Sequence, residues 1–479
     1  ISACLVGSEM CIRDRYNISM ISLPQSAVTV IDILKKAGFE AYAVGGSVRD
    51  LLLGMETKGW DFTTNATPEE ILALFPDSFY DNLFGTVGIK IRKQGDTTAP
   101  NGNEELEDIY EITTYRSEEG YEDHRHPDKI SWGKTLTEDL ARRDFTINAI
   151  AFDGKSLIDP YGGQKDLNEK RIRTVGIASE RFAEDALRML RAVRFAARLG
   201  FTIEDETAKA ISSHASSLTQ ISAERIRDEF FKILTATHAA DAILVLKNLG
   251  LLLYILPELE SSFATPQKSP KRHHIYDVGT HSVMAMKFCP STDPVVRLAT
   301  LIHDLGKPKT FRQDKTGLIT FYNHEVAGAH IAKDIGRRLR LSKKQSDLLY
   351  TLVRWHQFSV DERQTDSALR RFIRRVGKEN LPHILALRIG DRLGGGATET
   401  SWRLELYKKR LEEVQLQPFA VSDLHVNGHD VMKLYDTKPG PIIGKVLDAL
   451  FAEVEAGTLQ NDRDALLKRM EELKNLAAH

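Results

Sequence analysis

Residues 43–65 constrain the fold of this 479-residue chain more than any other stretch. The pattern in and around them predicts strand, glycine turn, short helix and strand over residues 40–44, 45–46, 48–53 and 60–63. Two adjacent glycines let the backbone approach an anion closely, and N–H groups at a helix start point towards it. Asp61, on the second strand, can hold the magnesium ion that neutralises a triphosphate. The stretch predicts a phosphate site, although a glycine pair before a helix can also be a simple tight turn.

The blocks on either side of this turn resemble a known family. G-G-S-V-R-D, followed by W-D-F-T-T-N-A-T-P-E-E-I, is similar to the nucleotidyltransferase head of class II CCA-adding enzymes and bacterial poly(A) polymerases. The resemblance implies that Asp61 is catalytic and binds Mg²⁺. The nucleotide-binding residues that it implies here are Gly45, Gly46, Ser47 and Arg49. The family usually has two acids, as D-x-D, whereas this chain has Gly59 in place of the first.

Glu111 lies in Y-E-I-T-T-Y-R, on a predicted strand where a lone acid often faces solvent. The family places its third acid in this strand, so the resemblance gives Glu111 a catalytic, magnesium-binding role beside Asp61. Residues 117–127 resemble the flexible loop that CCA-adding enzymes need for the final A. An ordinary surface loop would have the same composition.

The block R-R-D-F-T-I-N resembles the family motif that selects ribose over deoxyribose. Adjacent arginines can clamp phosphates in bidentate fashion, and an aspartate can accept hydrogen bonds from ribose hydroxyls. A solvated helix face could carry the same residues. The nucleotide contacts implied here are Arg142, Arg143, Asp144 and Asn148.

In E-D-A-L-R-M-L-R, three charged residues are spaced by three and are expected on one face of a helix: Asp185, Arg188 and Arg191. An exposed stripe of ion pairs would show the same spacing. The family uses this aspartate and the first arginine as a protein template for the incoming base. The resemblance implies that Asp185 and Arg188 match the Watson–Crick edge of C and, after a small rotation, that of A. The nucleotide-binding residues that it implies in this block are Asp185, Arg188 and Arg191.

Histidines and aspartates of the second half resemble an HD phosphohydrolase domain, including the diagnostic adjacent pair in L-I-H-D-L-G-K-P. A lone buried histidine is more often structural, but these residues follow the order of the HD family. The implied ligands of a divalent metal such as Mn²⁺, Ni²⁺ or Mg²⁺ are His281, His303, Asp304 and Asp391. The implied extra ligands or phosphate contacts are His324, His356 and Lys307.

Composition limits the class of protein. The chain is 42% hydrophobic and 28% charged, and no apolar run approaches the roughly 20 residues of a membrane span. Its net charge of −2 means that RNA binding must come from local basic clusters, such as those in 337–344 and 370–375. The three cysteines show no paired spacing, which favours a reducing, cytoplasmic setting.

The predicted fold class is α+β, with a small α/β nucleotidyltransferase head followed by an all-α neck, an HD domain and a helical tail. The first residues resemble a translated sequencing-adapter remnant, and the tail resembles the tRNA-elbow domain of long CCA-adding enzymes. The predicted divisions are a non-native leader at 1–19, the head at 20–160, the neck at 161–258, the HD domain at 259–400 and the tail at 401–479.

The resemblance implies addition of C, C and A to the tRNA 3′ end from CTP and ATP, with release of pyrophosphate. One alternative is an A-adding enzyme or poly(A) polymerase, because the head motifs are shared. Another is a metal-dependent phosphohydrolase whose head has become an RNA-binding module, which Gly59 favours. We expect a weakened metal site with transfer retained. Glu56 is a candidate substitute for the missing acid, and Asp50 is expected to support the glycine turn.

Overall fold

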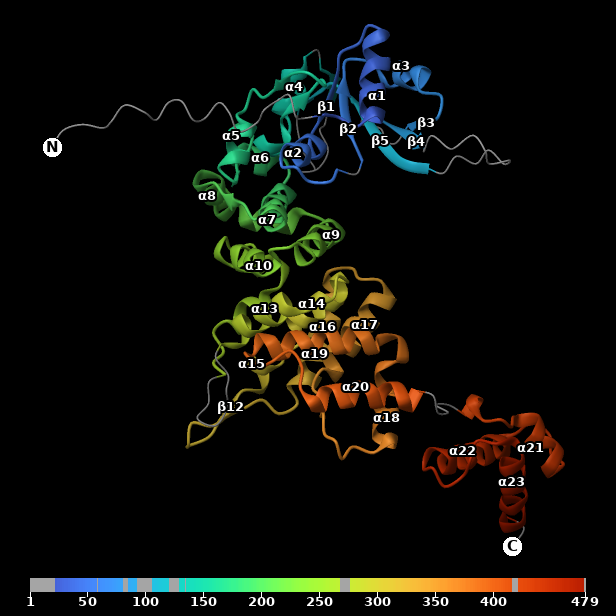
Figure 1. Ribbon diagram of the computed structural model, residues 1–479. Helices are drawn as coiled ribbons and strands as arrows, with labels where there is room; N and C mark the ends of the chain where they lie inside the picture. Colours follow the sequence, from blue (N-terminus) through green and yellow to red (C-terminus); the bar gives the residue numbers. More distant parts are fainter. Residues whose placement is uncertain are drawn as a thin grey trace. The chain divides into compact units, whose positions relative to one another are not determined.

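A computed structural model describes residues 22–57, 59–80, 85–92, 106–119, 129–133, 135–267, 276–415 and 421–477. The chain forms two compact units that divide between Pro257 and Glu258 (Figure 1). The predicted leader, 1–19, and residues 120–127 of the predicted loop lie outside the described residues. The start of that loop is a strand, β6 (Arg116–Glu119), paired antiparallel with β7 (Lys129–Trp132).

The first unit is built around a seven-stranded sheet in the order β3-β4-β5-β2-β1-β8-β9. Its strands are β1 (Ala41–Val44), β2 (Asp61–Thr64), β3 (Ser78–Tyr80), β4 (Thr86–Arg92), β5 (Leu106–Thr114), β8 (Ala151–Phe152) and β9 (Leu157–Ile158). The accompanying helices are α1 (Gln25–Lys36), α2 (Gly46–Leu52), α3 (Pro68–Leu74), α4 (Leu136–Ala141) and the 3-10 helix η2 (Thr146–Asn148). Strand β2 pairs antiparallel with β1 and parallel with β5. The predicted α/β head is confirmed.

Local sequence explains the elements that carry the head site. Thr67 and Glu70 form a reciprocal capping box at the start of α3. Gly45 caps α2 with φ 75° and ψ −139°, a conformation that is essentially open to glycine alone. A Cβ at Gly45 would also lie 3.0 Å from Arg143 Nη1 and 3.3 Å from Asp61 Oδ2. The turn therefore requires glycine for both its conformation and its close neighbours.

Helices of the neck follow the head. They are α6 (Ala178–Glu184), α7 (Leu187–Leu199), α8 (Asp205–His214), α9 (Ala223–Leu234), α10 (Ala239–Asn248) and α11 (Leu252–Ile255). The prediction that Asp185 shares one helix face with Arg188 and Arg191 is wrong. Asp185 has extended φ and ψ of −146° and 105° between α6 and α7, and its Oδ1 accepts from the Leu187 amide at 3.0 Å. The carboxylate thus satisfies an amide at the start of the next helix, where the chain turns.

The second unit is mainly helical. Its larger helices are α13 (Val278–Phe288), α14 (Pro294–Ile302), α16 (His324–Arg338), α17 (Lys343–Trp355), α18 (Asp366–Val376), α19 (Leu381–Gly394) and α20 (Trp402–Gln415). Helix α19 packs directly on α13, because Gly390 and Gly394 leave no side chain between them. An added Cβ would lie 2.5 Å from the Ala285 oxygen and 2.4 Å from the Ala285 nitrogen, respectively. This close approach brings Asp391 beside His281.

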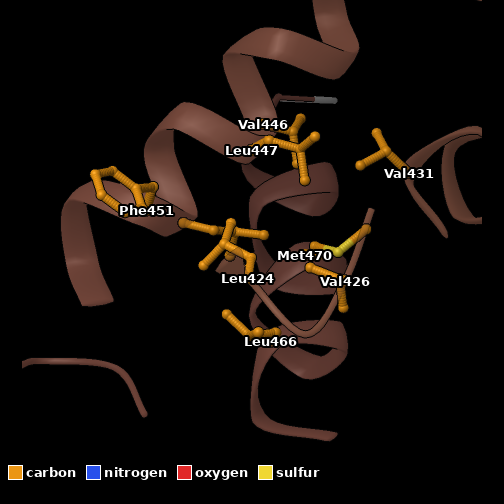
Figure 2. Packing of buried hydrophobic residues seen from close by; sticks show 9 residues of the cluster. Leu424, Val426, Val431, Val446, Leu447, Phe451, Leu466 and Met470 are labelled. Atoms are coloured by element: carbon orange, nitrogen blue, oxygen red, sulfur yellow. The ribbon is translucent and has the colours of Figure 1, made fainter. Parts of the chain in front are cut away.

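Three further helices bury their own core, shown in Figure 2. They are α21 (Gly428–Tyr435), α22 (Pro441–Glu455) and α23 (Arg463–Ala477). Arg370, in a predicted RNA-binding cluster, is buried and donates to the Glu455 carbonyl oxygen, so it joins α18 to α22. Helix α20, which begins after the predicted domain boundary at 400/401, packs on α18, which lies before it. The boundary itself stays a prediction. Among the described helices, none is long and apolar enough to cross a membrane.

Candidate functional site

A cavity of about 490 Å³ opens in the first unit and gathers most of the residues predicted to bind nucleotide. Ten of those eleven residues line it together with Asp61. Ser47 and Glu111 instead line an adjoining cavity of about 420 Å³, and the Ser47 hydroxyl donates to the Val44 carbonyl oxygen. Lining residues not predicted from the sequence are Leu187, Arg194, Phe195, Arg198 and Arg225. Eight arginines and three aspartates in one lining favour a ligand with several negative charges.

Buried ion pairs hold the arginines of this cavity in place. Asp139 is fully buried, and its carboxylate forms ion pairs with both arginines. Oδ1 lies 2.6 Å from Arg142 Nη2, and Oδ2 lies 3.3 Å from Arg143 Nη2. Burial alone would raise the pKa of the Asp139 carboxyl, but these two guanidinium groups lower it. The two arginines are therefore oriented before any ligand arrives, which reduces the entropy lost on binding.

A second network runs through Asp144. Its Oδ1 accepts from the Phe145 amide at 2.8 Å and from Asn148 Nδ2 at 3.0 Å, and its Oδ2 accepts from Arg191 Nε at 2.7 Å. Burial would raise the pKa of the Asp144 carboxyl, but Arg191 and Asn148 lower it to about 2. Asn148 also accepts from Arg49 Nη1 at 2.6 Å. Arg191 Nη2 also donates to Asp144 Oδ2, so a ribose hydroxyl could bond to Asp144 only if one of the donors to this carboxylate moved.

Asp185 and Arg188 both reach the cavity, each with a protein partner. Asp185 Oδ2 accepts from Arg225 Nη2 of α9 at 2.7 Å. Arg188 donates to the Glu184 carboxylate. The predicted base-selecting pair is thus brought together by the α6–α7 turn and by α9, rather than by one helix face.

The two acids of the predicted magnesium site lie side by side. Asp61 and Glu111 are direct partners in the parallel β2–β5 register, and both line the 420 Å³ cavity. Burial raises the pKa of the Asp61 carboxyl, and nearby Arg143 and Arg49 only partly oppose this shift. Two neighbouring carboxylates that line one cavity fit a divalent cation.

Gly59 does not lie in β2, which begins at Asp61, so the predicted strand start at residue 60 is wrong by one residue. Its φ of 68° is left-handed, and its amide donates to Asp108 Oδ2 at 2.7 Å. A residue here therefore does not share a strand face with Asp61. Glu56 lines the same cavity as Asp61 and Glu111. The Asp50 carboxylate is paired with Arg49 at 2.7 Å and with Arg198 at 2.7 Å, and its support of the glycine turn stays a prediction.

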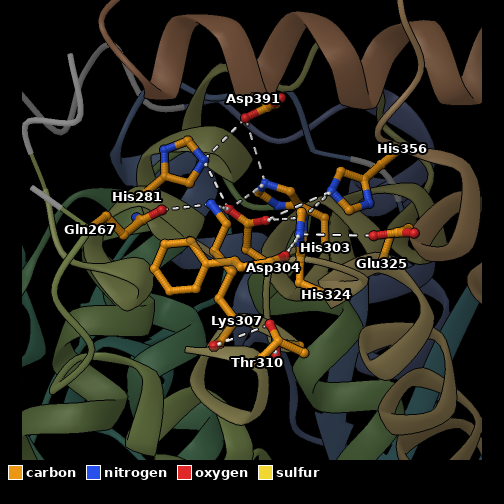
Figure 3. Close-up of polar contacts among 12 residues, drawn as sticks. Gln267, His281, His303, Asp304, Lys307, Thr310, His324, Glu325, His356 and Asp391 are labelled. Carbon is orange, nitrogen blue, oxygen red and sulfur yellow. Dashed lines mark hydrogen bonds and ion pairs between the residues drawn. The ribbon is translucent and has the colours of Figure 1, made fainter. Parts of the chain in front are cut away.

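The second unit brings together six residues that were predicted as metal ligands or extra ligands, and the four imidazoles among them surround the carboxylate of Asp304 (Figure 3). Asp304 Oδ2 lies 3.4 Å from His281 Nε2 and 3.2 Å from His303 Nε2. Its other oxygen, Oδ1, lies 3.3 Å from His324 Nε2 and 3.7 Å from His356 Nε2. Asp391 completes the group, with Oδ1 3.1 Å from His281 Nε2 and 3.6 Å from His303 Nε2.

Backbone carbonyls orient three of the four imidazoles. The Nδ1 atoms of His303, His324 and His356 donate to carbonyl oxygens three residues earlier, at 2.7, 2.8 and 2.8 Å. This leaves Nε2 of each ring as the inward-facing nitrogen, the arrangement found in histidines that bind metals. The inward nitrogens of His324 and His356 lie only 3.2 Å apart. Burial and the neighbouring His303 lower the pKa of His356 to about 3, so its ring is neutral, the form that binds a metal. These features fit a divalent cation.

A cavity of about 400 Å³ opens onto this cluster. Lys307, predicted to contact phosphate, lines it but is buried, with Nζ 2.5 Å from Asp304 Oδ2 and 2.6 Å from Gln267 Oε1. Lining residues not predicted from the sequence are Phe321, Tyr322, Asn323, Glu325, Gln357 and Arg388.

Comparison with protein families identifies three segments of the chain. Residues 41–173 match the poly A polymerase head domain. Residues 200–263 match the probable RNA and SrmB-binding site of polymerase A, and residues 318–470 match the putative tRNA nucleotidyltransferase domain 2.

Curated relatives named CCA-adding enzyme match over different lengths. The Latilactobacillus sakei enzyme is 33% identical over 445 residues, which cover 92% of this chain and 96% of the relative. The Leuconostoc mesenteroides enzyme is 32% identical over 462 residues, 95% of this chain and 98% of the relative. The Geobacillus thermodenitrificans enzyme is 45% identical over 233 residues, which cover 48% of this chain and 54% of the relative. In this match the chain therefore spans about half of the relative's length.

Solved structures of CCA-adding enzymes share the fold. The Bacillus stearothermophilus enzyme in complex with CTP is 29% identical with a TM-score of 0.71, over 95% of this chain and 98% of that chain. The Thermotoga maritima enzyme complexed with tRNA is 21% identical with a TM-score of 0.58, over 96% and 97%.

Proposed function

The chain belongs to the family of class II CCA-adding enzymes and poly(A) polymerases, and we propose from this premise that it is a CCA-adding tRNA nucleotidyltransferase. The enzyme adds C, C and A to the tRNA 3′ end from CTP and ATP in the cytoplasm, and it releases pyrophosphate. The observation that carries the proposal is the arginine-rich head cavity, in which predicted triphosphate-binding and base-selecting residues lie together.

In this mechanism the 3′ hydroxyl of tRNA attacks the α-phosphorus of the nucleotide. Asp61 and Glu111 would hold Mg²⁺, which activates the hydroxyl and stabilises charge on the transferring group when bound. Arg142 and Arg143, held by Asp139, bind the triphosphate. The glycine turn at Gly45 lets the backbone approach the phosphates.

Base choice follows from the chemistry of Asp185 and Arg188. The carboxylate accepts from the exocyclic amino group of C or A, and the guanidinium donates to the ring nitrogen beside it. Uracil and guanine present a carbonyl oxygen and an N–H at those positions, so both contacts would be lost. Arg225 positions Asp185 for this role.

Two alternative functions of the head can be distinguished by their products. An A-adding enzyme or poly(A) polymerase would use ATP alone, and a head kept only for RNA binding would transfer nothing. Near full-length similarity to proteins named CCA-adding enzyme favours CCA addition. The test is incubation of the purified protein with tRNA lacking its 3′ end and with CTP and ATP together, one of the two being labelled in each reaction. Incorporation of both nucleotides supports the proposal, and incorporation of A alone or of neither contradicts it.

The second unit favours a second function, a metal-dependent phosphohydrolase of the HD type. The observation behind this is the convergence of four imidazoles and two carboxylates on one cavity. The two oxygens of Asp304 face different imidazole pairs, so the cluster has ligands for a second metal ion as well. Mn²⁺, Ni²⁺ or Mg²⁺ would polarise a phosphate ester and promote ionisation of water. The substrates are 2′,3′-cyclic or terminal phosphates of RNA or nucleotides.

Metal content tests this second function. The protein is loaded with Mn²⁺ or Ni²⁺, desalted and analysed by elemental analysis beside a variant with His303→Ala and Asp304→Ala. A circular dichroism melt checks that the variant remains folded. Bound metal in the parent and its loss from the folded variant support the site, whereas equal metal content in both proteins contradicts it.

A further inference from the structure

Tyr322 is the most exposed large apolar or aromatic side chain of the described residues, at 76%. It lines the cavity that opens onto the cluster around Asp304. Within the part of the chain that the structure describes, its ring makes no hydrogen bond or ring contact. Single exposed aromatic residues are ordinary on protein surfaces, but this one forms part of a cavity beside a metal-ligand cluster.

Residues on both sides hold Tyr322 in position. Phe321 is buried, and its ring packs against Phe311 with centroids 5.9 Å apart. The Phe321 carbonyl accepts from His324 Nδ1 at 2.8 Å, which ties this segment to the cluster. Asn323 between them has φ 61°, a left-handed conformation that few non-glycine residues adopt. The exposed ring is therefore carried by an anchored backbone, which limits the entropy lost when a ligand stacks on it.

The same cavity has polar groups suited to a nucleotide. Arg388 lies with its guanidinium 5.5 Å over the Phe358 ring, and its Nη1 is 3.3 Å from Asp391 Oδ2. A guanidinium beside the metal ligands can bind a phosphate oxygen. The side-chain amides of Asn323 and Gln357 also line the cavity and can bond to a base edge or a ribose hydroxyl.

We propose that Tyr322 is a base-stacking residue of this site and that it selects nucleoside phosphates over phosphate esters without a base. This proposal rests on the phosphohydrolase function proposed above. The nucleoside is either free or the terminal residue of an RNA chain. In hydrolysis of a 2′,3′-cyclic phosphate, the water oxygen bonds to phosphorus while one ring P–O bond breaks. One water proton ends on the released ribose hydroxyl, and no other reactant is needed.

The test compares Tyr322→Ala and Tyr322→Phe with the parent, each loaded with Mn²⁺ or Ni²⁺. The substrates are 2′,3′-cyclic AMP and glycerol 1,2-cyclic phosphate, which has the same five-membered ring but no base. Stacking of one base accounts for roughly a tenfold change in affinity. We expect Tyr322→Ala to raise KM for 2′,3′-cyclic AMP about tenfold, with an unchanged KM for the glycerol ester and unchanged metal content. Tyr322→Phe should retain the parent KM.

An equal change for both substrates, or no change for either, would overturn the role of Tyr322 while leaving the hydrolase function intact. An RNA oligonucleotide with a 2′,3′-cyclic end, assayed in parallel, separates the two sources of the nucleotide. If the parent hydrolyses neither these substrates nor the terminal phosphate of 3′-AMP, the phosphohydrolase function fails. In that case, calorimetry of 3′-AMP binding decides the stacking role. The measurement uses proteins that also carry Asp185→Ala and Arg188→Ala, which weaken nucleotide binding by the head. Binding about tenfold weaker in Tyr322→Ala supports it, and equal binding refutes it.

Discussion

Replacing Gly59 by aspartate tests whether the head is limited by its missing carboxylate. Gly59 lines the same cavity as Asp61 and Glu111, and an added Cβ would meet only the Ile109 carbonyl oxygen, at 3.8 Å. A new side chain therefore has room there. Loss of a carboxylate ligand commonly costs several kcal/mol of transition-state stabilisation, or about a thousand-fold in rate. We expect Gly59→Asp to accelerate C addition and to lower the Mg²⁺ or Mn²⁺ concentration that the reaction needs.

The backbone limits this gain. Position 59 has φ 68°, so an aspartate there costs about 1 kcal/mol of folding stability, or a few degrees in Tm. The Gly59 amide is also held by the Asp108 carboxylate, and repulsion between the two acids would raise the pKa of the new one. The acceleration should therefore be about tenfold or more but stay below the full thousand-fold.

The assay is single-turnover C addition to tRNA lacking its 3′ end, measured across a range of Mg²⁺ and Mn²⁺ concentrations. Gly59→Asn is the matched control, because it has a similar shape and backbone cost but no charge. The reasoning is refuted if Gly59→Asp is no faster than the parent at any metal concentration. Equal acceleration by Gly59→Asn would refute it as well.

Three further substitutions test the site geometry. Gly45→Ala should lower the free energy of unfolding by about 1–3 kcal/mol in denaturant titration, because alanine does not tolerate the backbone angles of Gly45. Gly46→Ala is the control and should leave the free energy of unfolding unchanged, since its Cβ would come no closer than 3.5 Å to its neighbours. Equal losses in the two variants would contradict the argument. Gly394→Ala should lower Tm and the amount of bound metal, because the added Cβ would separate α13 from α19. Gly395→Ala is the control and should be tolerated, since its Cβ would come no closer than 3.4 Å to its neighbours. Unchanged metal content in Gly394→Ala would count against the packing argument. Asp185→Ala should make addition of C and A slow or promiscuous at similar RNA affinity, and unchanged nucleotide selectivity would exclude its role in base choice.

Features that depend on local chemistry could be predicted from the sequence. Thr67 and Glu70 form a capping box, a contact that depends only on residues within one turn. The glycine turn at Gly45 and the strand that carries Asp61 follow from short-range patterns. The order of histidines and aspartates indicated a metal cluster only through a family resemblance. Their actual convergence depends on helix packing, as at Gly394.

Features that depend on distant partners could not be predicted. The spacing of Asp185 and Arg188 indicated one helix, but Asp185 is turned out of the helix and bonded to Arg225, forty residues away. Phe195 in the head cavity and Tyr322 in the second cavity look in sequence like ordinary aromatic residues. The left-handed backbone at Gly59 is equally invisible, because glycine adopts either sign of φ.

The central claim, CCA addition by the head, is tested most directly by sequencing the 3′ ends of tRNA after incubation with the purified protein. The substrate is tRNA that ends at the nucleotide before the CCA sequence, with CTP alone, ATP alone or both. The account predicts two added C residues with CTP alone, CCA with both nucleotides and little addition with ATP alone. A run of A residues with ATP alone, or unchanged 3′ ends under every condition, would contradict it.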